Sequence, residues 1–414
     1  MVLAHGFPDT SAVWDGVARR LAERFHVVRY DLRGFGGSEA PRDVDGYAVG
    51  WLVEDLAAVV EAVGGPVHLV GHDWGSTQGW VAVAERPDLF RSFVSISGPD
   101  LGHVGSWVRR NRWRPVKVAG VVRRSWYILG FLVPVAPELV WRVPAVRRML
   151  HAGRRELVNG LGLYRANVGR RAGSARTSGK GATAGPKRVS VPVHQVELTA
   201  DPYVVREHLE AAEPWVEQLT RSTVHAGHWA VRTHPEQVAR HIEDAIDGRH
   251  GRRLVVVTGA GSGGGAVGRT LADGGAQVVG ADVADRAAAQ AFADDVSERY
   301  GVPEVVVANV GPHVGADWRE AVDAKLWGVA NVVRAFAPLM VERAAGGHFV
   351  VTARRDGTAR HAHATTKTAL RMLIRCLKGE LRPHGITVSL IFPDGGTVTE
   401  DVVRAVNARR RGYP

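Results

Sequence analysis

Short apolar runs recur along the chain, separated by polar or glycine-rich stretches. Such runs lie at residues 2–4, 65–70, 254–257 and 276–280, and the more polar residues 193–198 are also predicted as a strand. Their length and continuity are typical of strands buried on both faces, as in a parallel sheet. Residues 76–85 instead carry their apolar positions at helical spacing. The pattern therefore predicts an α/β fold in which strands alternate with helices.

The turn between the strand at 65–70 and the helix at 76–85 reads Gly71-His72-Asp73-Trp74-Gly75. A nucleophile between two small residues at a sharp strand-to-helix turn indicates the nucleophile elbow of α/β-hydrolases, with Asp instead of Ser. The glycines let the backbones pass closely, and the helix N-terminus favours the ionised form of Asp73. A carboxylate here attacks carbon and forms an ester that water must then hydrolyse. The alternative is that Asp73 only caps the helix.

Residues elsewhere in the first half supply the other parts of such a site. The backbone N–H groups of Phe7, in His5-Gly6-Phe7-Pro8, and of Trp74 are predicted to form an oxyanion hole. Asp201 follows the strand at 193–198, and His225 and His228 come after it. The order nucleophile, acid, His is that of the α/β-hydrolase triad. The chemistry requires a neutral imidazole that takes a proton from water and a carboxylate that fixes its tautomer.

Residues 1 to about 245 resemble an epoxide hydrolase of the α/β-hydrolase superfamily. The resemblance implies that Asp73 is the nucleophile and Asp201 the orienting acid. It favours His228 over His225 as the water-activating base, because the Gly-His-aromatic pattern of the family falls on Gly227-His228-Trp229. The implied reaction converts a small-molecule epoxide, apolar or lipid-like, to a vicinal diol, without a cofactor or a metal.

The same resemblance implies two cap tyrosines that protonate the opening ring oxygen. Tyr127 and Tyr164 lie in the matching segments, although either alone could be a packing residue between cap and core. Haloalkane dehalogenases are the alternative within this half, but Phe7 stands where their second halide-binding donor is expected. Fluoroacetate dehalogenases carry Arg where Trp74 stands. The residues therefore favour epoxide opening over dehalogenation.

The second half begins with a nucleotide-binding pattern. The strand at 254–257 leads into a glycine-rich turn with Gly259, Gly263 and Gly265, and a helix follows. A strand, a glycine turn and a helix seat a pyrophosphate on the helix N-terminus. The next strand is followed by Asp282, and an acid there hydrogen-bonds the adenosine ribose and favours NAD over NADP.

This half, up to about residue 400, resembles short-chain dehydrogenases/reductases. Residues 305–311, 346–351 and 386–391 look like three strands of that family, and Asn309 and Lys367 fall at its cofactor-side positions. Between Asp282 and Val305 there is room for about one helix, where the family has two helices and a strand. The resemblance therefore implies a shortened, Rossmann-type doubly wound sheet with NAD as its cofactor.

The catalytic residues of that family are mostly absent. His363 occupies the position of the tyrosine, four residues before Lys367, so the two share a helix face. The serine position falls at Ala353 or Arg354, and the helix asparagine aligns with Lys325. We expect this half to be a degenerate domain without reductase activity. The alternative is an NAD(P)-dependent oxidoreductase in which His363 carries the proton.

Together the halves resemble the actinobacterial fusions of an epoxide hydrolase with a short-chain dehydrogenase. The predicted domains are an α/β-hydrolase at 1–247 and a Rossmann-type domain at 253–414, joined by a short polar linker. The helical cap of the hydrolase is expected at about 101–190. Only a strand stub precedes His5, so the hydrolase sheet is expected to lack the first edge strands of its family, unless the start codon is misassigned.

Charge and composition add two expectations. The formal net charge is +11, and residues 101–190 contain 19 Lys and Arg against Glu138 and Glu156, which gives +17. This basic cap suits an anionic membrane surface better than nucleic acid, for which no recognition fold is visible, although it could also be a solvated arginine-rich face. The run at 126–141 is broken by Pro134, Pro137 and Glu138, so it is too short and interrupted to span a bilayer and is expected as a buried or interface-touching cap helix. A single cysteine, Cys376, and no visible signal peptide indicate a cytoplasmic protein, and the basic cap adds the expectation of peripheral membrane association.

Overall fold

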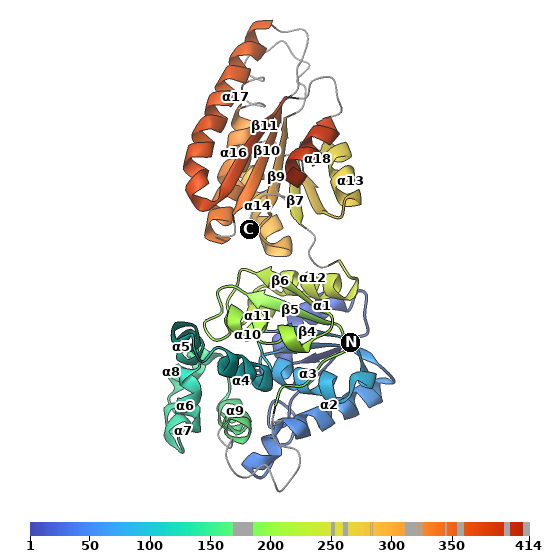
Figure 1. The fold of residues 1–414 in the computed structure, drawn as a ribbon, viewed down its shortest axis with the longest axis vertical. Coiled ribbons are helices and arrows are strands. Elements are labelled where there is room, and N and C mark those ends of the chain that lie inside the picture. The colour runs from blue at the N-terminus through green and yellow to red at the C-terminus, as the bar shows by residue number, and fades with distance from the viewer. Residues whose placement is uncertain are drawn as a thin grey trace. The chain divides into compact units, whose positions relative to one another are not determined.

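The computed structural model describes residues 1–168, 185–249, 253–259, 264–281, 283, 285–310, 322, 326–343, 346–353, 360–392 and 398–408. The chain separates into two compact units, Met1–His250 and Gly251–Pro414 (Figure 1). Each unit has its own parallel sheet and its own helices, and each is described by itself.

The first unit is built on six parallel strands in the order β2-β1-β3-β4-β5-β6. The strands are β1 (Val2–Ala4), β2 (Val28–Tyr30), β3 (Val67–His72), β4 (Phe90–Ile96), β5 (Val193–Leu198) and β6 (Leu219–Val224). The three-residue β1 pairs with both β2 and β3, so the strand stub before His5 lies inside the sheet. The predicted strands at 2–4, 65–70 and 193–198 are confirmed within two residues.

Helices cover both faces of this sheet. The helices are α1 (Asp15–Leu21), α2 (Val49–Val63), α3 (Trp74–Glu85), α10 (Arg206–Glu210), α11 (Ala230–Thr233) and α12 (Pro235–Ile246). Leu3 and Val70 pack with α1 and α12 on one face, and Val2 and Leu69 pack with α2 and α3 on the other. Neighbouring residues thus enter opposite cores, as the period of two in a strand requires.

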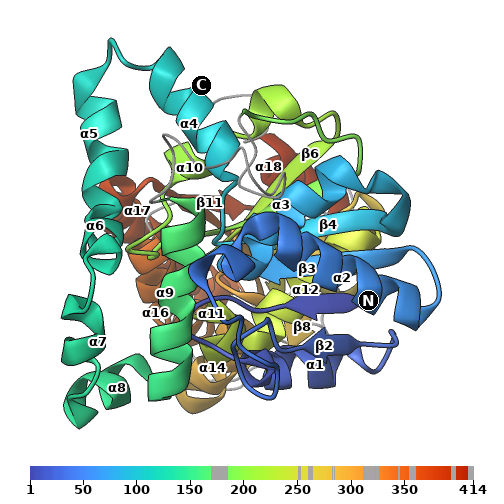
Figure 2. The same ribbon diagram turned by 90° about the horizontal axis from the view of Figure 1, so that it is seen from below.

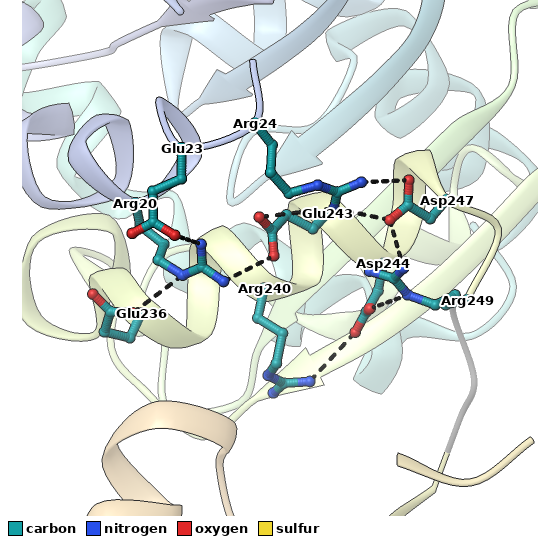
Figure 3. A network of polar contacts seen from close by, with 9 residues as sticks. All are labelled: Arg20, Glu23, Arg24, Glu236, Arg240, Glu243, Asp244, Asp247 and Arg249. Atoms are coloured by element: carbon teal, nitrogen blue, oxygen red, sulfur yellow. Dashed lines mark hydrogen bonds and ion pairs between the residues drawn. The ribbon is translucent and has the colours of Figure 1, made fainter. Parts of the chain in front are cut away.

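A network of ion pairs joins α1 to α12 (Figure 3). Arg20 reaches Glu236 at 3.7 Å and Glu243 at 3.5 Å. Arg24 reaches Asp247 at 3.0 Å, and Asp247 also accepts from Arg249 at 2.7 Å. Because four arginines and five carboxylates alternate here, the charges compensate one another at the surface, and the network fixes the end of α12 against α1.

The helical cap lies between β4 and β5. Its helices are α4 (Leu101–Arg110), α5 (Pro115–Arg124), α6 (Trp126–Leu132), α7 (Ala136–Val140), α8 (Pro144–Leu150) and α9 (Arg154–Asn167). The single helix expected at 126–141 is wrong: α6 ends before Pro134, because a proline in the helix interior removes a hydrogen bond and clashes with the preceding turn. Helices α5, α6, α7 and α8 follow one another along one edge of the unit in both views (Figures 1 and 2). In the described part of the chain, no helix is long and apolar enough to cross a membrane.

The second unit has five parallel strands in the order β11-β10-β9-β7-β8. The strands are β7 (Leu254–Thr258), β8 (Gln277–Ala281), β9 (Val305–Val310), β10 (Gly347–Ala353) and β11 (Ile386–Ile391). The helices are α13 (Gly264–Asp273), α14 (Arg286–Tyr300), α16 (Gly328–Arg343), α17 (Arg360–Leu381) and α18 (Val398–Ala408). The strand order reverses beside β7, so the sheet is doubly wound, as predicted.

Helices lie on both faces of this second sheet as well. Residues of α14, α16 and α17 share one core with Val256, and residues of α13 and α18 share the other with Val257. Of the described residues between β8 and β9, only α14 is helical or extended. This agrees with the expectation of a sheet shortened at that place.

Candidate active site

Asp73 stands at the turn between β3 and α3. Its backbone has φ 53° and ψ −122°, a conformation that L-residues rarely adopt. Its carbonyl accepts hydrogen bonds of 2.9 Å from the N–H groups of Ser76 and Thr77, which begin α3. The strained turn lifts the carboxylate out of the strand and holds it at the N-terminal end of the helix.

The glycines around Asp73 are required by close backbone contacts. A Cβ at Gly75 would overlap the carbonyls of Ala4 and His5, and one at Gly71 would overlap the backbone of Gly75 and Ser76. The elbow therefore packs directly against the end of β1, which brings the His-Gly-Phe-Pro loop beside the carboxylate.

The two oxygens of Asp73 have different partners. The N–H of Phe7 donates a hydrogen bond of 2.7 Å to Oδ1. Oδ2 lies 3.6 Å from Nε2 of His228. The N–H of Trp74 also faces this loop, since a Cβ built on Gly6 would touch both it and Oδ1. The structure thus places the Phe7 N–H on one oxygen, with the Trp74 N–H beside the same loop, and leaves the other oxygen toward the histidine.

His228 lies between two carboxylates. Its Nδ1 is 3.0 Å from Oδ2 of Asp201, and its side chain is buried. Burial disfavours the charged imidazole, but hydrogen bonding to Asp201 and Asp73 outweighs it and raises the pKa of His228 to about 10. His225, the alternative base in the sequence, instead pairs with the Thr199 hydroxyl at 2.7 Å.

Asp201 is fixed by the loop that follows β5. Its Oδ1 accepts backbone hydrogen bonds from Tyr203 at 2.7 Å and Val204 at 3.1 Å. Burial opposes its charge, yet the hydrogen bonds, first of all that from His228, hold the pKa of Asp201 below its usual range. Asp201 is therefore ionised at neutral pH and orients the imidazole through Nδ1.

Ser97 is a site residue that the sequence did not reveal. It follows β4 with φ 51°, its Oγ donates to Oδ2 of Asp201, and the same Oγ lies 2.9 Å from Nδ1 of His228. Its position follows from the order of strands in the sheet and not from a sequence motif: β4 and β5 are parallel neighbours, so the residues after them meet at the same edge.

The two predicted cap tyrosines meet above the elbow. Tyr127 comes from α6 and Tyr164 from α9, and their ring centroids are 6.2 Å apart. Tyr164 also lies 5.1 Å from the Trp74 ring. Burial and the nearby Asp73 charge raise the pKa of both phenols, so both keep their protons at neutral pH.

Aromatic side chains surround the tyrosine pair. Phe131 lies 5.0 Å from Tyr164 and 5.7 Å from Trp141, and Phe7 lies 5.5 Å from Tyr164. On the other side, the Tyr203 ring is 5.1 Å from His228. These surroundings suit an apolar molecule beside the carboxylate.

Asp9 is a second residue that the motif analysis missed. Its Oδ2 accepts a hydrogen bond of 3.0 Å from Nε1 of Trp229, the residue after His228. Burial raises the pKa of Asp9 to about 6, against the opposing hydrogen bond from Trp229 and charge of Arg232. At neutral pH this buried carboxyl is therefore ionised, and its charge lowers the stability of the folded state.

In the second unit, the structure brings part of the predicted cofactor set together. Nδ2 of Asn309, at the end of β9, donates a hydrogen bond of 3.3 Å to the carbonyl of Gly259, after β7. Gly259 has φ 74°, which favours glycine. Gly265 lies in the first turn of α13, and Lys367 on α17 places its Nζ 4.4 Å from the ring centroid of Phe392.

The other predicted positions of this unit are only partly described. Ala353 ends β10, and His363 lies on α17, where its side chain is outside the described residues. Outside the described residues altogether lie Gly263, Asp282, Lys325 and Arg354.

The two units match two family models. Residues 1–124 match the model of the alpha/beta hydrolase fold, and residues 267–410 match that of short chain dehydrogenases. A solved Bacillus megaterium epoxide hydrolase in complex with an inhibitor has the fold of the first unit, with a TM-score of 0.51, 23% identity and coverage of 60% of this chain and 93% of that one. The chain therefore joins an α/β-hydrolase domain to a short-chain dehydrogenase domain.

Two relatives define the protein family of this chain more closely. The probable oxidoreductase EphD of Mycobacterium tuberculosis is 32% identical over 494 residues, an alignment that covers 97% of this chain and 81% of that protein. Epoxide hydrolase 3 of Mus musculus is 31% identical over 139 residues, covering 33% of this chain and 36% of its own. The chain belongs to the EphD family, and its first domain is an enzyme domain of the hydrolase type, similar to epoxide hydrolases.

Proposed function

We propose that the first unit hydrolyses an epoxide to a vicinal diol through an ester on Asp73. The proposal rests on the different partners of the two carboxylate oxygens of Asp73. Oδ1 accepts a hydrogen bond from the N–H of Phe7, whereas Oδ2 faces His228 and is available as the nucleophile. The buried tyrosine pair beside it supplies the proton that ring opening needs.

In the first step, Oδ2 of Asp73 attacks an epoxide carbon from the side opposite the carbon–oxygen bond. That bond breaks, and the ring oxygen takes a proton from Tyr127 or Tyr164. The products are an alkyl ester of Asp73, a neighbouring alcohol and a phenolate. Two hydroxyls at the ring oxygen hold it in line for this displacement.

The ester then changes the state of His228. Since Asp73 has lost its charge, one of the two groups that raise the pKa of His228 is gone, and the pKa falls. The imidazole proton returns to the phenolate, and the neutral imidazole becomes the base. Asp201, which keeps its charge, holds the tautomer with Nε2 free.

In the second step, His228 takes a proton from water, and the hydroxide attacks the ester carbonyl carbon. The charge that develops on Oδ1 is stabilised by the N–H groups of Phe7 and Trp74. Collapse breaks the ester bond, the imidazolium returns its proton to the departing alkoxide, and the diol leaves. The second proton of water, left on the Asp73 carboxyl, passes to His228, which restores the carboxylate and the imidazolium of the starting state.

Single-turnover mass spectrometry with styrene-type and long-chain epoxides tests this mechanism. In His228→Gln we expect an adduct on the peptide that contains residues 71–75, because alkylation proceeds and hydrolysis does not. His225→Gln is the matched control, since His225 pairs only with Thr199 at the loop surface. Folded protein that gives neither adduct nor diol would refute the proposal.

For the second unit, we propose NAD binding without reductase activity. The positive φ of Gly259, its hydrogen bond from Asn309 and Gly265 in the first turn of α13 fit a pyrophosphate. Asp282 lies outside the described residues, and its place in the sequence, directly after β8, is that of an acid that binds the adenosine ribose. Bound NAD would supply hydride transfer, but His363 stands at the tyrosine position and Ala353 or Arg354 at the serine position, so the groups that polarise a carbonyl are missing.

The proposal also includes a location and partners. One cysteine among 414 residues fits a reducing compartment, and we propose the cytoplasm. The aromatic surroundings of the tyrosine pair favour an apolar, lipid-like epoxide, and the basic cap favours an anionic membrane surface nearby.

A further inference from the structure

We infer that the outer edge of the cap, formed by helices α5 to α8 with Trp113 before them, is the surface that docks on an anionic bilayer. The inference rests on the proposed function in one respect: it assigns the substrate as an epoxide dissolved in that bilayer. Docking itself depends only on the residues of the cap.

The first observation is that each of these helices carries at least one large apolar side chain exposed to solvent. Val116 on α5 is 86% exposed, Trp113 just before it 80%, Trp126 on α6 71%, and Met149 on α8 71%. Other large exposed apolar residues of the same stretch are Val122, Leu129, Val133, Val135, Leu139, Val140 and Val143. In the described parts of the chain, the remaining large exposed apolar residues are Val44, Trp51, Trp327 and Met372, so exposure of this kind is concentrated on one edge.

The second observation is charge. Residues 113–150, which form this edge, contain seven Lys and Arg and one acid, Glu138, a net charge of +6. Glu138 is paired with Arg165 at 2.7 Å, so it does not neutralise the exposed arginines. Arg114, Lys117, Arg123 and Arg148 are among the exposed basic residues and lie between the exposed apolar ones.

Exposed apolar side chains together with positive charge favour one binding partner for this edge, an anionic bilayer. A second copy of this cationic edge would repel the first, because the same patch would face itself in a two-fold dimer. Nucleic-acid interfaces are polar and use few exposed aliphatic residues, whereas Val116, Leu129 and Met149 would need to be buried. An interface rich in arginine with Trp, Leu and Val matches helices that lie in the headgroup region of an anionic bilayer.

Helix α6 connects the docking edge to the candidate active site. Trp126 and Leu129 are exposed on it, whereas Tyr127 and Phe131, four residues apart, pack with Tyr164. Because residues i and i+4 share a helix face, α6 has one face toward lipid and the other toward the carboxylate of Asp73. A docked cap therefore places the proton donor one helix diameter, about 10 Å, from the membrane.

Vesicle co-sedimentation of the full chain tests the docking edge. We expect binding to phosphatidylcholine vesicles that contain phosphatidylglycerol, little binding to pure phosphatidylcholine, and weaker binding as salt rises. Trp113→Ser/Met149→Ser should weaken binding roughly tenfold, since both side chains would lose their apolar burial. Trp327→Ser/Met372→Ser removes an exposed Trp and Met from the second unit and is the matched control.

Several outcomes would overturn the inference: no vesicle binding by folded protein, equal loss in the two double variants, or the same variants changing self-association or nucleic-acid binding instead. Turnover separates this inference from the proposed function. The docking variant should keep its rate on a water-soluble epoxide and lose rate on one carried in anionic vesicles. Intact vesicle binding without turnover of either epoxide would refute the proposed function alone.

Discussion

The N–H of Phe7 donates a hydrogen bond of 2.7 Å to Oδ1 of Asp73, and this makes the two oxygens of the carboxylate unequal. The bonded oxygen is already where an oxyanion would be stabilised, so it is suited to remain the carbonyl oxygen of an ester. The other oxygen is suited to attack. In the proposed mechanism, this relationship decides which atom of the product comes from the protein.

A single turnover in water enriched in heavy oxygen should therefore leave the diol unlabelled and label Asp73. The diol receives Oδ2 of the enzyme, and the oxygen of water enters the carboxylate when the ester is hydrolysed. Mass spectra of the diol and of the peptide with residues 71–75 measure both. Label in the diol of the first turnover would indicate direct attack of water on the epoxide.

Ser97→Ala should slow ester hydrolysis about tenfold and leave alkylation unchanged. Ser97 contacts Asp201 and His228, which act in the second step, and loss of one hydrogen bond of about 1.4 kcal/mol corresponds to that factor. Burst kinetics with a chromogenic epoxide separate the two steps. The control is Ser92→Ala on the same strand, whose hydroxyl pairs with His68 instead. Equal effects on both steps would indicate only a structural role.

Tyr127→Phe and Tyr164→Phe should each slow alkylation about a hundredfold, and the double variant should abolish it, because general-acid catalysis is worth roughly that much. Ester hydrolysis should change little, since it depends on His228. The measurement is the rate of adduct formation in a His228→Gln background. Tyr300→Phe in the second unit is the control. Full activity of the double variant would assign the tyrosines to packing.

The sequence was sufficient to predict the structure where a local pattern of residues and a chemical requirement fall on the same segment. The strand, the elbow and the helix around Asp73 follow from glycine spacing within five residues, and the chain order placed Asp201 and His228 beside it. Ser97 and Asp9 could not be found this way, because they approach the site through the order of strands in the sheet and through the side chain of Trp229.

The cap shows a different limit of sequence reasoning. The net charge of the cap could be counted from the sequence. The exposure of its apolar residues could not, because it depends on how α5 to α8 pack. The end of α6 before Pro134 can be read from the sequence, but the exposure of Trp126 and Leu129 follows only from the way this helix packs. Tyr127 and Trp126 are neighbours in the chain with opposite environments, and only the helix faces distinguish them.

The full chain should bind NAD more tightly than NADP and should not reduce it with simple alcohols. Binding depends on the glycine turn and Asp282, whereas proton transfer would need the tyrosine that His363 replaces. Calorimetric titration measures affinity, and absorbance of the reduced cofactor measures turnover. Asp282→Ala should weaken NAD binding, with Asp273→Ala as the control. Cofactor reduction that is lost in Lys367→Ala would instead support an active oxidoreductase.

Asp9→Asn should stabilise the protein at pH 8 and much less at pH 4. Burial raises the pKa of Asp9 to about 6, from 3.8, so the folded state binds its proton more tightly than the unfolded state. The stability that this proton supplies is complete below pH 3.8 and is lost as the pH rises through about 6. Asn carries no charge and can still accept the bond from Trp229, so it avoids the cost of a buried carboxylate at pH 8.

Thermal unfolding at the two pH values measures the effect, with a shift of roughly 2–4 °C for each kcal/mol in a unit of this size. Asp31→Asn is a control of opposite sign. Against the cost of its partial burial, backbone hydrogen bonds from Gly37 and Ser11 hold the pKa of Asp31 below its ordinary value. Its contribution is present above the unfolded pKa of 3.8 and is lost as the pH falls through the lower folded pKa, so its loss should destabilise the protein at both pH values. Shifts of the same sign in both variants would contradict the assigned burial of Asp9.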